Sequence, residues 1–179
     1  YSSIVPLIPT GKGTSASHLS WTDDKFLEGE ASIIEISGVY KKYHCPMART
    51  VLLGKPDQKK IDTMKRTREA LQAGIDVTKP GNTADDVAQA FWKVLDKYGI
   101  EKKSRTGYSI GIGYPPDWGE HTLNIQKGDK TVLQKNVCFH MIAVMQFGEW
   151  GVESSESIRV SENGAENFYK FPGELHIKG

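Results

Sequence analysis

Ala31-Ser-Ile-Ile-Glu-Ile-Ser-Gly-Val-Tyr40 is the stretch that does most to decide the expected fold, because its isoleucines and valine favour a strand. A second apolar run, Met47–Leu53, follows closely and is expected to pair with it. Side chains alternate between the two faces of a strand, so Glu35 shares a face with Ile33 and Ser37. A carboxylate among isoleucines is costly to bury unless it is paired or protonated.

Glu35 therefore allows two interpretations. In the first, the strand lies at the edge of a sheet and the carboxylate of Glu35 faces water. In the second, Glu35 lines a site, where desolvation raises its pKa and makes it a general base or nucleophile near neutral pH.

Helical patterns follow the expected strand pair. Asp57 begins a long helix in which Gly74 loosens the last turn, and Thr83 caps a second helix that ends at Gly99. Further strands are expected at residues 4–8, before the strand pair, and at 131–133, 138–147 and 158–160, after the helices. A hairpin turn is expected at 162–164. Strands, two consecutive helices and strands again indicate an α+β fold.

The composition is that of an ordinary globular domain. The chain has 179 residues, 38% of them hydrophobic and 25% charged, and a formal net charge of +1. This charge indicates neither nucleic acid nor a membrane surface as a partner, and the cluster Lys102, Lys103 and Arg105 is expected to be a solvated helix end. No apolar run has the length of a membrane span, and two cysteines without a CxxC pair suit the reducing cytoplasm.

A glycine-rich stretch, Gly107–Glu120, is the most unusual part of the sequence. It is expected to be a loop whose Tyr114 and Trp118 form a rigid wall over a small ligand, or alternatively a loop that packs the core. Residues 107–111 match the G-x-S-x-G pattern of serine hydrolases around Ser109, but no strand precedes them and Pro115-Pro116 cannot begin a long helix.

The five histidines show no paired spacing, so a zinc site within a short motif has little support. Glu153 and Glu156 lie in a polar run and are expected to be a solvated turn.

Six motifs in order along nearly the whole chain resemble the creatinase/aminopeptidase, or pita-bread, family. They are His18 after a Gly/Ser loop, Glu28-Gly-Glu30, Cys45-Pro-Met-Ala-Arg-Thr50, Lys79-Pro-Gly-Asn-Thr83, Thr106-Gly-Tyr-Ser-Ile-Gly111 and Val160-Ser-Glu-Asn-Gly-Ala-Glu166. The resemblance implies a pseudo-twofold curved antiparallel sheet flanked by helices. Residues 1–179 would be the catalytic domain, truncated at its N-terminus and without the family's N-terminal domain.

Metallopeptidases of that family bind two metal ions through two Asp, one His and two Glu. The flanking motifs place these five positions on Glu35, Pro46, Tyr108, Ile142 or a neighbour, and Ser155, with a slip of one residue to Glu156 left open. No carboxylate lies near Ile142 in the sequence. Pro and Ile offer no ligand atom, so the resemblance implies neither a metal site nor another cofactor.

Within the family the likeness to the ectoine hydrolases is greater. It rests on Tyr43-His-Cys-Pro46, Tyr114-Pro-Pro-Asp-Trp-Gly-Glu120 and Phe139-His140. It implies a metal-independent hydrolase that opens a small cyclic amidine to an N-acetyl diamino acid. A cytoplasmic homodimer is also implied. A metallopeptidase for Xaa-Pro bonds, a creatinase-like amidinohydrolase and an inactive binding module remain alternatives.

The roles that this resemblance suggests are hypotheses about single side chains. Glu35 attacks the amidine carbon or activates water, His18 or His140 moves protons, and Tyr108 donates a hydrogen bond to developing charge. The expected substrate-binding side chains are Tyr114 and Trp118 beside a cationic ring, Glu120 in the same loop, and Glu156 at the ring nitrogens.

Overall fold

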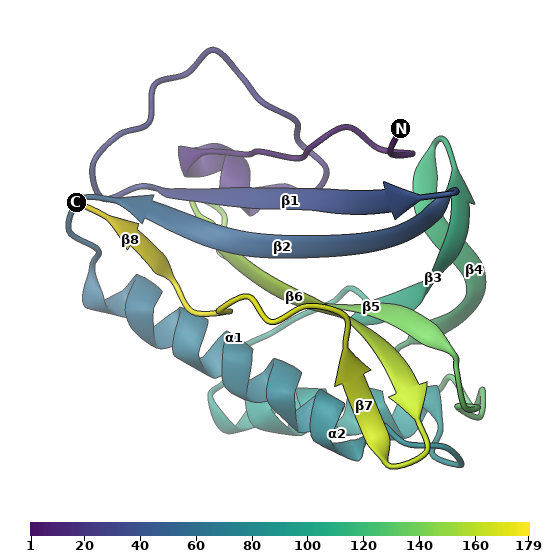
Figure 1. Cartoon of the computed structure of the whole chain (residues 1–179). Coiled ribbons are helices and arrows are strands. Elements are labelled where there is room, and N and C mark those ends of the chain that lie inside the picture. The colour runs from purple at the N-terminus through teal and green to yellow at the C-terminus, as the bar shows by residue number, and fades with distance from the viewer.

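A curled sheet and two helices make up the computed structural model, which describes all residues 1–179 (Figure 1). The strands run in the order β1-β2-β3-β5-β6-β7, while β4 pairs with β3 and β8 with β2. Their bounds are β1 Ala31–Tyr40, β2 Tyr43–Leu53, β3 Gly107–Tyr114, β4 Asp117–Ile125, β5 Cys138–Gln146, β6 Gly151–Ser161, β7 Gly164–Asn167 and β8 His176–Lys178. The expected α+β pita-bread architecture is confirmed.

The pairing of β1 with β2 is confirmed, and it brings Glu35 opposite Ala48. β2 begins at Tyr43, before the expected Met47, because Lys41 and Lys42 adopt positive φ angles of 48° and 70° and turn the chain within two residues.

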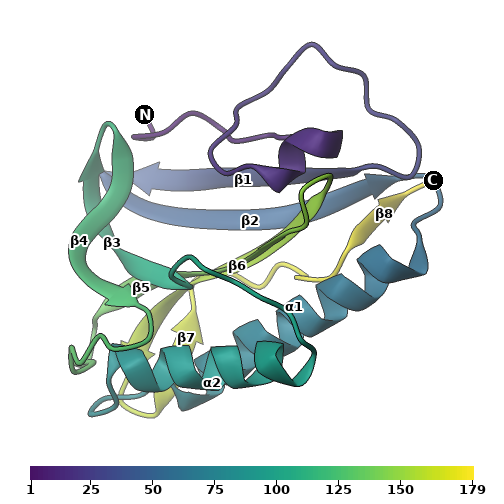
Figure 2. The ribbon, with the colours of Figure 1, turned by 180° about the vertical axis from the view of Figure 1, so that it is seen from behind.

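Two antiparallel helices, α1 (Gln58–Val77) and α2 (Ala84–Lys97), cover one face of the sheet (Figure 2). The expected caps are present: Asp57 accepts from the Lys60 amide at 2.8 Å, and Thr83 forms a capping box with Asp86. Gly74 does not loosen the helix, which continues to Val77. A Cβ at Gly74 would lie 2.1 Å from Met141 Cε, so this position lets α1 approach β5 closely.

Neither helix combines the length and the apolar character that crossing a lipid bilayer requires. Their buried faces instead form one hydrophobic core with β4, β5 and β6. Its largest members include Phe91, Leu95, Phe139, Met141 and Ile158.

Several expected elements differ in the structure. Residues 107–120 are not a loop, because β3 pairs with both β4 and β5 and only Pro115 and Pro116 remain at the turn. Glu153 and Glu156 are not in a solvated turn, because both lie inside the buried strand β6. Residues 4–8 and 131–133 contribute only isolated bridges, whereas the hairpin turn before β7 is confirmed.

Side-chain hydroxyls join β2 to β6 where no backbone ladder connects these two strands. Thr50 Oγ1 donates to the Glu153 carbonyl at 2.8 Å and accepts from the Glu153 amide at 2.7 Å. Ser155 Oγ accepts from the Ala48 amide at 2.7 Å, and Ser157 Oγ donates to a β2 carbonyl 2.6 Å away. We call Thr50, Ser155 and Ser157 the hydroxyl seam. It satisfies backbone groups that burial would otherwise leave unpaired.

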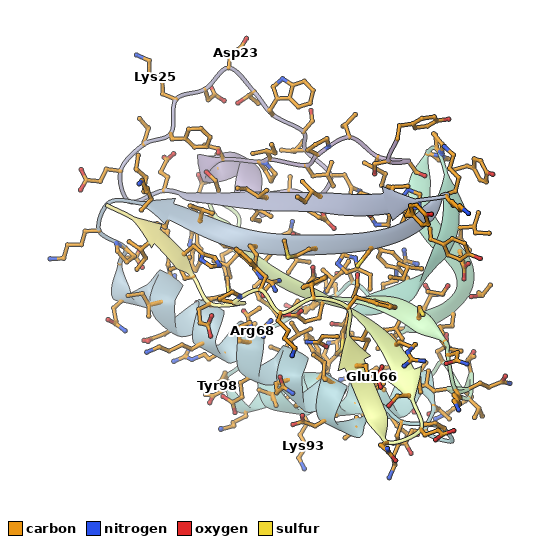
Figure 3. The ribbon with its side chains drawn as sticks, in the orientation of Figure 1. Asp23, Lys25, Arg68, Lys93, Tyr98 and Glu166 are labelled. Carbon is orange, nitrogen blue, oxygen red and sulfur yellow. The ribbon has the colours of Figure 1, made fainter.

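A buried ionic cluster fixes the C-terminal segment beside this seam. Glu156 Oε1 accepts from Arg49 Nη2 at 3.1 Å and from Arg68 Nη1 at 2.7 Å. Arg68, labelled in Figure 3, belongs to α1. Arg49 also donates to the carbonyls of Phe171 and Pro172 at 2.8 and 2.7 Å. The Arg49–Glu156–Arg68 cluster therefore joins β2, β6, α1 and the chain before β8.

Glu156→Gln should lower the free energy of unfolding by about 3 kcal/mol, because it leaves two arginine charges without their carboxylate, one of them fully buried. Urea denaturation followed by circular dichroism measures the change. Glu174→Gln, at an exposed carboxylate of the same segment, is the control and should stay within about 0.5 kcal/mol of the parent protein. Equal effects of the two substitutions would contradict this account of the cluster.

Candidate active site

A cavity of about 240 Å³ lies where the N-terminal segment passes over the sheet. In Figure 2 this segment follows β1 and places the short 3-10 helix Gly11–Ser15 beside it. The N-terminal segment, the chain before β3, and strands β1, β3, β4, β5 and β6 all contribute to the lining. Its polar and aromatic members are Ser17, His18, Glu35, Ser104, Arg105, Tyr108, Asp117, Trp118 and Glu153.

The N-terminal segment explains why Glu35 is buried although β1 is an edge strand of the sheet. The Leu7 amide donates to the Glu35 carbonyl, and the Glu35 amide donates to the Leu7 carbonyl, both at 2.9 Å. A further bond joins the Ile33 amide to the Pro9 carbonyl at 3.0 Å. Glu35 is only 8% exposed, so the interpretation in which it faces water is wrong.

Glu153 is a second buried carboxylate in the same cavity. The sequence predicts a solvated turn there, because Glu153 begins the polar run of residues 153–157. The structure buries it by packing β6 against β2, where Thr50 holds both its amide and its carbonyl. Burial raises the pKa of Glu153 to about 7, although the nearby ammonium group of Lys102 acts in the opposite direction.

Lys102 is not the solvated helix end that its position in a basic cluster suggests. It is buried, and its ammonium group donates to Ser104 Oγ and, at 3.0 Å, to the Arg105 carbonyl. Burial lowers its pKa to about 8, and the carboxylate of Glu153 partly offsets that change.

Glu35 and Glu153 titrate as a pair. Burial raises the pKa of Glu35 well above its usual range, and the charge of Glu153 raises it further. Two carboxylates in one water-poor cavity resist double ionisation, so the pair retains a proton near neutral pH. The cavity thus offers one carboxylate as a base or nucleophile and one carboxylic acid as a proton donor.

His140 lies behind the cavity wall rather than in it. Its Nδ1 lies 3.0 Å from Tyr108 Oη and its Nε2 lies 2.7 Å from Ser155 Oγ. Burial, with a smaller effect from Arg49, lowers the pKa of His140 to about 3, so the ring is neutral at physiological pH. Burial and the charge of Glu35 raise the pKa of Tyr108, whose hydroxyl also accepts from Trp118 Nε1 at 2.5 Å.

The structure brings four of the eight expected site residues to the cavity: Glu35, His18, Tyr108 and Trp118. His18 there has a positive φ of 62° and an exposed side chain. The catalytic and substrate-binding roles assigned to these four side chains stay predictions.

Three expected substrate-binding residues lie elsewhere. Tyr114 is 61% exposed at the tip of the β3–β4 hairpin. Glu120 lines a second hollow, of about 820 Å³, beside the β1–β2 turn. Glu156 is held in the Arg49–Glu156–Arg68 cluster and does not line the cavity. Trp118 and Glu120 are two positions apart on β4 and would share a face of a regular strand. The β3–β4 pairing is irregular here, with shifts of register on both sides of Ile110, and the two side chains line different hollows.

Glu153→Gln should change how stability depends on pH. The folded-state pKa of Glu153, about 7, lies above that of an unfolded glutamate, so its contribution is full below about pH 4.3 and is lost as the pH rises through 7. Relative to the parent protein, the variant should therefore gain stability between pH 4.5 and 8. The gain should approach about 3 kcal/mol, at about 1.4 kcal/mol per pKa unit.

Urea denaturation across this pH range measures the difference in free energy of unfolding. Glu149→Gln, at an exposed carboxylate in the turn before β6, is the control and should change the free energy of unfolding far less than Glu153→Gln does. A pH-independent difference for Glu153→Gln would show that its carboxyl titrates normally.

The sequence matches the metallopeptidase family M24 over residues 1–162. It is 44% identical to the ectoine hydrolase of Halomonas elongata over 179 residues, which cover 99% of this chain and 45% of that protein. The dipeptidase PepE from Mycobacterium ulcerans superimposes with a TM-score of 0.89 at 27% identity, over 96% of this chain and 46% of that one. A dipeptidase from Pyrococcus horikoshii gives a TM-score of 0.89 at 23% identity, over 97% and 48%. This chain thus spans less than half the length of these relatives.

Proposed function

Because this chain belongs to the metallopeptidase family M24, we propose that it hydrolyses a C–N bond as that family does, but without metal ions and in a small cyclic amidine of the ectoine type. The observation that carries the proposal is the pair of buried carboxylates, Glu35 and Glu153, in one small cavity walled by Tyr108 and Trp118.

The side chains at the family's five ligand positions do not fit a pair of metal ions. Glu35 alone is a carboxylate, while Pro46 and Ile142 offer no side-chain donor. Tyr108 and Ser155 are joined through His140, so their oxygens are already engaged in hydrogen bonds. No group of three or more His, Cys, Asp or Glu side chains is arranged to hold a metal ion. A hard dication needs more oxygen or nitrogen donors than these positions supply.

The charges around the cavity suit a small zwitterion that has a cationic ring and a carboxylate. Glu35, Glu153 and Asp117 supply negative charge, and the rings of Tyr108 and Trp118 favour a flat cation. Arg105 lies at the same cavity with its guanidinium 4.7 Å from the Tyr108 ring, and arginine binds carboxylates well. A volume of about 240 Å³ admits a single small ring rather than an extended peptide.

The reaction needs water to add to the amidine carbon and one ring nitrogen to leave. In the proposed mechanism, the reactive form of the pair is the one in which Glu35 is ionised and Glu153 holds the retained proton. Glu35 removes a proton from the attacking water, or attacks the carbon itself and is released when water hydrolyses the bond so formed. Protonated Glu153 gives its proton to the departing nitrogen as the carbon–nitrogen bond breaks. The amidinium ion and water thereby become an amide and an ammonium group, as in ring opening of a tetrahydropyrimidine carboxylate to an N-acetyl diamino acid.

Glu35→Gln should reduce kcat for ectoine by about 10³-fold or more, because it removes the group that attacks or activates water. The assay follows the N-acetylated product by chromatography, with the complete gene product as enzyme. Glu28→Gln, at an exposed position before β1, is the control and should keep full activity.

Undiminished turnover by Glu35→Gln would contradict the proposal. Hydrolysis of Xaa-Pro dipeptides that stops on addition of a chelator would instead identify a metallopeptidase.

A further inference from the structure

We infer that His140 carries its proton on Nδ1, that Ser155 holds it in this tautomer, and that Tyr108 consequently directs its own hydroxyl proton into the cavity. His140 and Ser155 are then positioning residues that act through Tyr108. The tautomer follows from the hydrogen bonds alone, whereas its effect on catalysis rests on the proposed function.

The hydroxyl of Ser155 has two neighbours within hydrogen-bonding distance. The Ala48 amide lies 2.7 Å away and can only donate, so Ser155 Oγ accepts from it. The other neighbour is His140 Nε2, also at 2.7 Å. The serine proton has no other acceptor, so Ser155 donates it to Nε2, which is therefore unprotonated.

The neutral ring of His140 must then carry its proton on Nδ1. Its neighbour there is Tyr108 Oη at 3.0 Å, which accepts this proton. The indole of Trp118 can only donate, and it donates to the same oxygen at 2.5 Å. Both lone pairs of Tyr108 Oη are thus occupied by donors.

The hydroxyl proton of Tyr108 has no acceptor among these neighbours, and the remaining direction leads into the cavity that Tyr108 shares with Glu35. The opposite tautomer would direct two donors, the Ala48 amide and His140 Nε2–H, at Ser155. It would leave the buried serine proton without a partner, which is costly. With the proton on Nδ1, every donor around His140 has an acceptor, and the hydroxyl proton of Tyr108 is available to the substrate.

This arrangement separates His140 from the proton-shuttle role that its sequence position suggests. A fully buried ring with both nitrogens engaged does not reach the substrate. It instead orients Tyr108 as a preorganised donor to the tetrahedral carbon's oxygen or to Glu35, and donors fixed before the reaction need no reorganisation during it.

Two-bond proton–nitrogen correlation spectra of protein labelled with ¹⁵N-histidine test the tautomer directly. A His140→Gln variant identifies the His140 signals among those of the five histidines. We expect the parent protein to show protonated Nδ1 and unprotonated Nε2 at neutral pH. Protonation of Nε2 instead of Nδ1, or of both nitrogens, would overturn the inference. This result would come from the parent protein, in which Ser155 is unchanged.

Ser155→Ala tests the positioning role, and Ser161→Ala, the same substitution at the end of the same strand, is its control. Ser155→Ala should produce a mixture of tautomers and lower kcat for ectoine about tenfold with little change in KM. Complete loss of one preorganised donor lowers kcat roughly 100-fold, and Ser155→Ala misdirects the Tyr108 proton in only part of the molecules. Ser161→Ala should leave the spectrum and kcat unchanged, because Ser161 donates to the Gly164 carbonyl in the β6–β7 hairpin and lies outside the seam and the cavity.

An unchanged tautomer and unchanged kcat in folded Ser155→Ala would overturn the positioning role. If the parent protein opens no cyclic amidine, the proposed function fails while the nitrogen spectra still decide the tautomer, so the two failures are distinguishable.

Discussion

The hydroxyl seam between β2 and β6 is the interaction on which the site depends. These strands come from the two halves of the curled sheet and meet without a backbone ladder, so Thr50, Ser155 and Ser157 satisfy the buried amides and carbonyls between them. The seam fixes Glu153 beside Glu35 and places Ser155 against His140. Ser155 therefore both satisfies a buried amide of β2 and holds the ring of His140.

Under the proposed function, this network lies where the metallopeptidases of the family bind metal ions. Tyr108 and Ser155, which the sequence motifs place at two of those ligand positions, are hydrogen-bonded through one neutral histidine. The proposal assigns the chemistry to Glu35 and Glu153, whose burial favours retention of a proton by the pair. In this account the carboxylates perform the chemistry, and the protein provides their desolvation.

The sequence predicts those features that depend on local pattern. The β1–β2 pair and the caps at Asp57 and Thr83 follow from apolar strand patterns and capping motifs. For Glu35 the flanking isoleucines leave burial and exposure both open, and the pairing of Leu7 with β1 decides for burial. The burial of Glu153 could not be predicted, because Gly151 and Ser155, which share its face of the strand, are not apolar. The packing of β6 against β2 removes Glu153 from water. The strands within residues 107–120 were not predicted either, because their glycines suggest a loop. Pairing with β5 and between β3 and β4 makes these residues a hairpin.

The most direct test of the central claim measures metal content and turnover in the same sample. The complete gene product, purified in the presence of a chelator, is analysed by inductively coupled plasma mass spectrometry and then assayed with ectoine. The account predicts full turnover with far less than one metal ion per protein chain, and no increase when manganese, zinc or cobalt is added. Turnover that falls with the metal content and returns with added metal would contradict it.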